Sequence, residues 1–195
     1  MDIIMEKERQ TVRHFSHRHA LQPCQVKEED LIFCSCCEVE ITVPAYECTK
    51  PKCGFHLHQL CFELPKQVRL ESHPRHPLTL LPSSPYQNGE FFCNGCGDFG
   101  SGFTYHCSVC QFDLHVGCAS CPESLKLEQH QHPLMLNTVF PSKKENCAIF
   151  LCGLCNRSVE ENCWIYYCQA CDYGTHLDCA IREEDQEDNP EEIVF

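Results

Sequence analysis

The chain repeats one arrangement of metal-binding residue types three times: two cysteines, two further cysteines, four residues and then His-x-x-Cys. Cysteine sulfur and histidine nitrogen are the usual ligands of structural zinc, and closely spaced cysteine pairs are typical of zinc knuckles. The first cysteines of the three copies lie at positions 34, 93 and 152, so the spacing is regular. We therefore expect metal-binding units in tandem. Their ligand candidates are Cys34, Cys37, Cys48, Cys53, His58 and Cys61; Cys93, Cys96, Cys107, Cys110, His115 and Cys118; and Cys152, Cys155, Cys168, Cys171, His176 and Cys179.

A pair of histidines ahead of each copy completes the ligand count. Six ligands do not fit four-coordinate zinc, because one site leaves two ligands over and two sites need eight. We expect the first cysteine pair and the His-x-x-Cys to share one ion, and the second cysteine pair to bind another with the upstream histidines. The two sites then interleave, which gives about six Zn²⁺ in the chain. The upstream pairs are His17 and His19, His73 and His76, and His130 and His132.

The first copy departs from the pattern. Four residues rather than two separate Cys48 from Cys53, and three histidines precede the copy. We favour His17 and His19 by analogy with the third copy, but the spacing of His14 and His17 equals that of the second copy's pair, so His14 is an alternative.

Five cysteines lie outside the repeated pattern. They are expected to act as small buried hydrophobic residues, with a role as substitute ligand or as reactive thiol as alternatives. These are Cys24, Cys36, Cys121, Cys147 and Cys163.

Short strands must position these ligands. Residues 90–92, 102–106 and 112–114 are rich in aromatic residues and each runs into a ligand, which is typical of strands that deliver side chains from their ends. The segment 60–64, after the first His-x-x-Cys, is expected to form one helical turn. We predict small zinc-stabilised, β-rich modules with little helix.

Five segments are predicted along the chain: an N-terminal extension (1–13), three units (14–65, 73–122 and 130–182) and a disordered acidic tail (183–195). Units of this size bury too little apolar surface to be stable without an added cross-link, either a disulfide bond or a bound metal ion. The N-terminal residues lack the apolar run of a signal peptide, and no segment reaches the roughly 20 apolar residues of a membrane span. We therefore expect a cytoplasmic or nuclear location, in which the cross-link is zinc rather than disulfides.

Charge and ligand count restrict the function. The formal charge of −13 should repel phosphate backbones and anionic lipid surfaces, so neither nucleic acid nor membrane is expected as a partner. A catalytic zinc keeps one position open for water, whereas the predicted sites are filled by four protein ligands. We expect no enzymatic activity and a protein partner. The sequence predicts neither the identity of that partner nor the oligomeric state.

The pattern resembles the C1-type cysteine/histidine-rich zinc fingers, specifically the divergent DC1 domains of plants. The shared motifs are H-x-x-H-P-L from His73, F-F-C-x-x-C ending at Cys96, and Y-x-C-x-x-C-x-F-x-L-H-x-x-C from Tyr105 to Cys118, with echoes in the other copies. The resemblance covers about residues 14–182. It implies three tandem DC1 domains with two interleaved zinc sites each, in an interaction module of intracellular signalling or stress response.

The sequence departs from ordinary C1 domains at two places. Those domains have a further cysteine about eight residues after His-x-x-Cys, and Arg69, Lys126 and Glu187 stand there, so the second upstream histidine must replace it. Diacylglycerol-binding C1 domains carry Gly-x-x-x-Gln-Gly between the cysteine pairs, and no copy has that glutamine, which disfavours lipid binding. Three more functions are typical of cysteine-rich chains: a PHD-like histone-tail reader, which would leave the upstream histidines idle, a nucleic-acid-binding zinc finger, and a thiol oxidoreductase that uses the Cys-x-x-Cys pairs.

Overall fold

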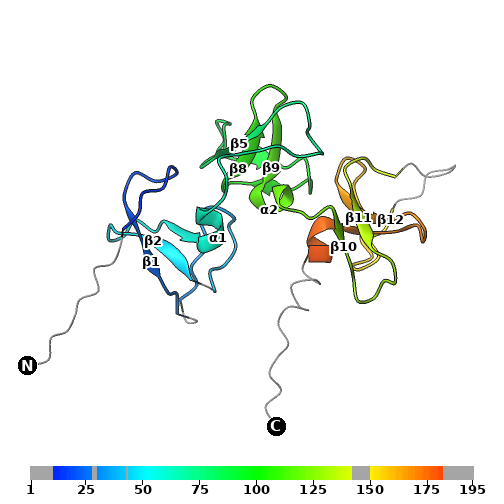
Figure 1. The fold of residues 1–195 in the computed structure, drawn as a ribbon, viewed down its shortest axis with the longest axis horizontal. Helices are drawn as coiled ribbons and strands as arrows, with labels where there is room; N and C mark the ends of the chain where they lie inside the picture. The colour runs from blue at the N-terminus through cyan, green and yellow to red at the C-terminus, as the bar shows by residue number, and fades with distance from the viewer. Residues whose placement is uncertain (1–10, 28–29, 43, 142–149, 182–195) are drawn as a thin grey trace, which may run out of the picture.

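The computed structural model describes residues 11–27, 30–42, 44–141 and 150–181. The predicted acidic tail, most of the N-terminal extension and Cys147 lie outside these residues. The described residues form three small antiparallel sheets, which follow one another as separate lobes, and a two-stranded hairpin in the second lobe (Figure 1). The prediction of small β-rich modules with little helix is confirmed. The helices that the structure describes are all too short or too polar to cross a bilayer.

The first sheet has three strands in sequence order. β1 (Leu21–Cys24) pairs with β2 (Ala45–Cys48), and β2 pairs with β3 (His56–His58). The helix α1 (Gln59–Phe62) follows β3 directly, at the place where the sequence predicts one helical turn.

The second sheet has four strands and a separate hairpin. The hairpin contributes the first cysteine pair, which follows its first strand. The helix α2 (Val116–Ala119) follows the last strand of the sheet. The sheet order is β4 (Gln67–Val68), β5 (Leu78–Leu81), β8 (Thr104–Cys107) and β9 (Phe112–His115), and the hairpin consists of β6 (Phe91–Phe92) and β7 (Phe99–Gly100).

The third sheet repeats the order of the second, and residues 177–181 form a helical turn after it. Its first strand, like β4, lies in the segment that the sequence analysis leaves between units. Each of these two-residue strands lies at the edge of its sheet. The strands are β10 (Ser124–Leu125), β11 (Leu134–Asn137), β12 (Ile165–Cys168) and β13 (Tyr173–His176).

One register is common to the three sheets and sets the position of the ligands. The histidine of each His-x-x-Cys ends the last strand and lies opposite the residue three places before the third cysteine; the pairs are Ala45 with His58, Thr104 with His115, and Ile165 with His176. The first cysteine pair is held in a turn whose following residue has positive φ, which is 62° at Glu38, 83° at Gly97 and 58° at Asn156. The same backbone geometry therefore presents the ligands in all three units.

The units are joined by contacts that recur at both junctions. The backbone N–H of Phe103 donates to the carbonyl of Cys36 (2.9 Å), and that of Trp164 donates to the carbonyl of Gly95 (2.8 Å). Counted from the cysteines, Phe103 and Trp164 are equivalent, and so are Cys36 and Gly95. One buried apolar cluster includes residues of all three units, such as Leu57 of the first.

A second hydrogen bond is also repeated. The hydroxyl of Tyr105 donates to the carbonyl of Pro65, and that of Tyr166 donates to the carbonyl of Pro122, both at 2.8 Å. These tyrosines are equivalent positions, two residues before the third cysteine of their units, and both are almost fully buried. The second unit therefore docks on the first in the way that the third docks on the second.

Candidate metal centres

The first cysteine pair and the His-x-x-Cys come together in each unit. Cys93, Cys96, His115 and Cys118 form a group in which the candidate ligand atoms lie within 4.8 Å of one another, and the equivalent residues of the first unit form another. The Nδ1 atom of His115 lies 3.3 Å from Cys96 Sγ. In the third unit, His176 Nδ1 lies 3.4 Å from Cys155 Sγ and 3.7 Å from Cys179 Sγ. Each group thus combines three thiols and one imidazole, as the ligand order predicts.

Backbone hydrogen bonds orient these side chains. The Nε2 atoms of His58 and His176 lie 3.1 and 3.0 Å from the carbonyl oxygens of Glu40 and Ser158. A carbonyl only accepts, so Nε2 carries the proton and the Nδ1 lone pair faces the sulfurs. The backbone N–H of His115 donates to Cys93 Sγ (3.4 Å), which supports negative charge on that sulfur.

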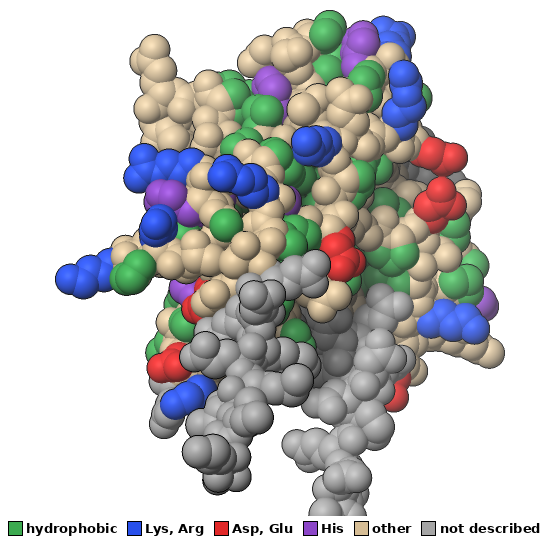
Figure 2. Space-filling model, turned by 60° about the vertical axis from the view of Figure 1, so that its left-hand side comes forward, with side chains coloured by type: hydrophobic (Ala, Val, Ile, Leu, Met, Phe, Trp, Pro, Cys, Tyr) green, Lys and Arg blue, Asp and Glu red, His purple; other side chains and the backbone are tan. Residues whose placement is uncertain are grey.

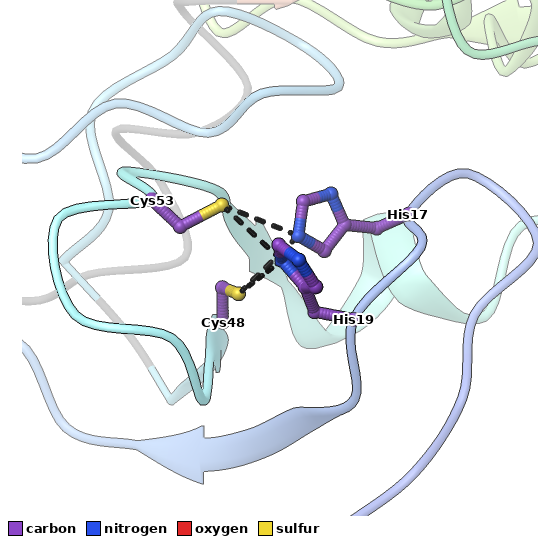
Figure 3. A group of neighbouring side chains, drawn as sticks. All are labelled: His17, His19, Cys48 and Cys53. Atoms are coloured by element: carbon purple, nitrogen blue, oxygen red, sulfur yellow. Dashed lines mark hydrogen bonds between the residues drawn. The ribbon is translucent and has the colours of Figure 1, made fainter.

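The second cysteine pair meets the upstream histidines. Figure 3 shows the two imidazoles of His17 and His19 beside the thiols of Cys48 and Cys53. His17 Nε2 lies 3.2 Å from Cys48 Sγ and 3.4 Å from Cys53 Sγ, and His19 Nδ1 lies 3.5 and 3.8 Å from the same two sulfurs. The longer Cys48–Cys53 loop therefore still brings its thiols together. The equivalent groups are His73, His76, Cys107 and Cys110, and His130, His132, Cys168 and Cys171.

His14 lies elsewhere. Its Nδ1 atom is 2.6 Å from the hydroxyl oxygen of Ser16, and its ring contacts Phe15 and Phe62. Of the three histidines that precede the first copy, the structure thus brings His17 and His19 to the cysteine pair. His56 and His106, which the repeat does not predict as ligands, also have other neighbours: the Gly54 carbonyl for His56 and the Asp113 carboxylate for His106.

An aromatic ring supports the first histidine of each upstream pair, and sequence reasoning missed this role. His17 stacks on Phe55, His73 on Phe112 and His130 on Tyr173, with interplanar angles of 11°, 17° and 12°. In each unit the aromatic residue stands three places before the histidine of His-x-x-Cys. The recurrence of this aromatic residue can be seen in the sequence. Aromatic residues in short strands are usually part of the hydrophobic core, however, so the sequence alone did not indicate that they stack on a histidine.

The groups fit a tetrahedral zinc ion. With Zn–S about 2.3 Å and Zn–N about 2.0–2.1 Å, neighbouring nitrogen and sulfur ligands lie about 3.5 Å apart. The nitrogen–sulfur distances above agree with that value. The Nε2 atoms of His73 and His130 are buried without a hydrogen-bond partner, and they are equivalent to the His17 Nε2 that faces the thiols. A buried nitrogen lone pair without a partner is costly, and a metal ion would satisfy it.

The thiols polarise one another. Hydrogen bonds from Cys118 and Cys96 lower the pKa of Cys93, whereas the pKa of Cys118 is raised because its thiol donates to Cys93. Hydrogen bonds with Cys93 and Cys96 raise the pKa of His115 to about 10. In the first unit, hydrogen bonds from Cys37 and Cys61 likewise lower the pKa of Cys34. In these two groups the thiolate form is therefore most favoured at the first cysteine, Cys34 or Cys93, which a divalent cation would bind.

The described cysteines outside the pattern are less reactive than ordinary thiols or are fully buried. Burial raises the pKa of Cys24 and Cys121 to about 11 and also raises the pKa of Cys163. Cys36 is 1% exposed. Cys36 therefore matches the expected role of a small buried apolar residue, whereas Cys24, Cys121 and Cys163 are only half-buried. Because the thiolate is the reactive form, their raised pKa lowers their reactivity.

A model of the C1 domain family matches residues 71–119 and 128–180, which together make up more than half of the chain. The chain belongs to the C1 domain family. The two matched segments cover most of the second and third units, and the first unit lies outside them. As C1 domain residues, the Cys/His groups described above are suited to binding zinc.

One curated relative shares part of the chain. Over 61 residues the chain is 34% identical to probable nucleoredoxin 1 of Arabidopsis thaliana. The aligned stretch makes up 31% of this chain and 10% of that protein, so the chain spans about a tenth of the relative that it matches. No solved structure matches the chain significantly.

Proposed function

We propose that the chain is a tandem array of three plant-type DC1 domains, each of which binds two zinc ions. The observation that carries this proposal is that the Cys/His side chains gather in groups of four, with tetrahedral spacing, in the first unit as well as in the two units that the family model matches. One ion in each unit takes three thiolates and one imidazole, and the other takes two of each. The two zinc ions then cross-link the two ends of a unit that has only a small apolar core.

Metal stoichiometry tests this proposal. Native mass spectrometry of the full chain should show six zinc ions, and Cys118→Ala should lose one ion from the second unit. The conservative control is Cys121→Ala, which removes a neighbouring thiol outside the groups and should keep all six. Three ions in the wild-type protein would refute the two-site assignment and leave the upstream histidines a packing role.

We further propose that the loaded array is a noncatalytic module that binds another protein in intracellular signalling or stress-response assemblies. Filled four-ligand sites leave no position at which zinc could activate water. Zinc therefore serves folding, and binding falls to the surfaces that the folded units present. An affinity capture with the zinc-loaded chain should retain a partner that a chelator-treated sample fails to retain.

Thiol oxidoreductase activity is the second candidate, which the nucleoredoxin similarity raises. Catalytic Cys-x-x-Cys thiols would react with a thiol reagent in the metal-loaded protein, whereas zinc-bound thiolates would react only after chelation. We expect the second result. Fast modification of Cys93 and Cys96 in the loaded protein, followed by peptide mapping, would favour the redox function instead.

A further inference from the structure

The two junctions create a cleft that no single unit contains. Its lining comes from the first cysteine turn of the first unit, the corresponding turn and α2 of the second, and the helical turn 177–181 of the third. Its volume is about 370 Å³, comparable with small-ligand sites, which often lie between domains. Figure 1 shows α2 between the first lobe and the orange helical turn of the third.

Apolar and acidic side chains share this lining. Val39, Val116 and Ile181 are apolar lining residues, one from each unit; Val39 is 59% exposed, Ile181 is half-buried and Val116 is buried. The acidic residues are Glu38, Asp98 and Asp178, again one from each unit, and the described lining includes no lysine or arginine. On the face that Figure 2 draws, most of the visible Lys and Arg side chains lie in the upper half, so positive charge is unevenly distributed over this face.

The charge of the cleft is held in place. The Glu38 carboxylate of the first unit accepts hydrogen bonds from the Ser101 backbone N–H (3.2 Å) and hydroxyl of the second. The candidate zinc ligands Cys37, Cys96 and Cys118 also line the cleft. A zinc ion with three thiolates and one neutral imidazole carries a net charge of about −1, so the loaded centres add to the negative field.

We propose that this junction cleft, defined by Glu38, Val39, Asp98, Val116, Asp178 and Ile181, binds a lysine or arginine side chain and an adjacent apolar residue from a basic segment of a protein partner. The carboxylates match the cation, and the three apolar side chains match its neighbour. The inference rests on the proposed role as a protein-binding module, and it names the surface and the chemistry of the partner. All three units contribute, so the intact array is required.

Fluorescence anisotropy tests the proposal with the zinc-loaded full chain and a labelled peptide of alternating lysine and leucine. A glutamate–leucine peptide of equal length is the comparison, and only the basic peptide should bind. Asp98→Asn combined with Asp178→Asn should weaken binding about tenfold, since it removes two of the three carboxylates that face the cation. Val39→Lys, at an exposed position, should weaken it further by placing a like charge in the cleft.

A charge-matched control separates the cleft from the overall charge. Glu71→Gln combined with Glu161→Gln removes two exposed acids outside the cleft and should change the dissociation constant less than twofold. Equal weakening by both double variants, or no binding of the basic peptide, would overturn the proposal. The zinc count of each variant verifies folding. If a captured cellular partner binds the Asp98→Asn/Asp178→Asn variant as well as the wild type, the interaction function stands and this assignment of the surface falls.

Discussion

At the scale of residues, the imidazoles in the candidate zinc centres are oriented by contacts other than those with sulfur. His58 and His176 have Nε2 beside a backbone carbonyl, which leaves Nδ1 for the metal. His17, His73 and His130 instead stack on an aromatic ring, and His17 directs its Nε2 atom to the thiols of Cys48 and Cys53. Outer contacts of this kind fix ligand geometry before the ion arrives, which lowers the ordering cost of binding.

The stacked ring can be tested at Phe112. Phe112→Ala removes the ring on which His73 stacks. The zinc affinity of the His73/His76/Cys107/Cys110 group should therefore fall about 10-fold, measured as transfer of zinc to a competing chelator. Phe112→Tyr is the matched control, because the third unit has Tyr173 at this position, and it should retain wild-type affinity. Equal loss in both variants would show that the ring acts through general packing and not through the histidine.

Protonation of the thiols predicts how zinc binding depends on pH. Hydrogen bonding to Cys34 raises the pKa of both Cys37 and Cys61, so these thiols are protonated at neutral pH without metal. Zinc must displace those protons, so binding should release acid and weaken as the pH falls through the neutral and acidic range, which lies below the raised pKa of both thiols. Because metal binding is coupled to folding, thermal stability should fall over the same window. Calorimetry in two buffers of different ionisation enthalpy measures the protons, and a pH-independent affinity would contradict the ligand assignment.

At the scale of elements, short strands and turns place the ligands, and much of this could be predicted. The Cys-x-x-Cys and His-x-x-Cys spacings predicted which side chains approach one another, and the aromatic segments predicted the strands before them. The edge strands β4 and β10 could not be predicted, because two-residue strands such as Gln67–Val68 have no periodicity and form only against an existing sheet. The choice of ligand nitrogen also depends on backbone carbonyls such as that of Glu40, which any residue type can supply.

The β6–β7 hairpin provides a prediction at this scale. Gly100 in β7 lies against the His115 ring, and a Cβ atom there would lie within 3.0 Å of both His115 and Phe91. Gly100→Ala should therefore displace the imidazole and destabilise the second unit by about 1–3 kcal/mol. Gly117→Ala in α2 is the control, since a Cβ there meets nothing within 4 Å and alanine favours a helix. Unfolding should begin at a lower chelator concentration for Gly100→Ala but not for Gly117→Ala. An unchanged unfolding profile of Gly100→Ala would contradict the close packing of Gly100 against His115 and Phe91.

At the scale of the whole molecule, the repeated hydrogen bonds make an ordered array from three small units. Phe103 and Trp164 donate to carbonyls in the cysteine turn of the preceding unit, so the turn that carries candidate zinc ligands in one unit is also the contact point for the next. The first unit has Pro44 at the equivalent position, and proline has no N–H to donate. Zinc loss in one unit should therefore loosen its junction as well as its own fold.

Gly102 tests whether the junction, rather than the zinc centres, sets the arrangement of the units. A Cβ atom at Gly102 would lie within 3.0 Å of the Cys36 carbonyl oxygen, the acceptor of the Phe103 hydrogen bond. The backbone cannot move aside as a flexible side chain could, so Gly102→Ala should separate the first unit from the second while both keep their zinc. Small-angle scattering should show a larger radius of gyration and native mass spectrometry an unchanged metal count, with Gly117→Ala matching wild type in both. If the Gly102→Ala variant kept the wild-type radius, the junction would be a loose contact, and a cleft built from three units would lose its structural basis.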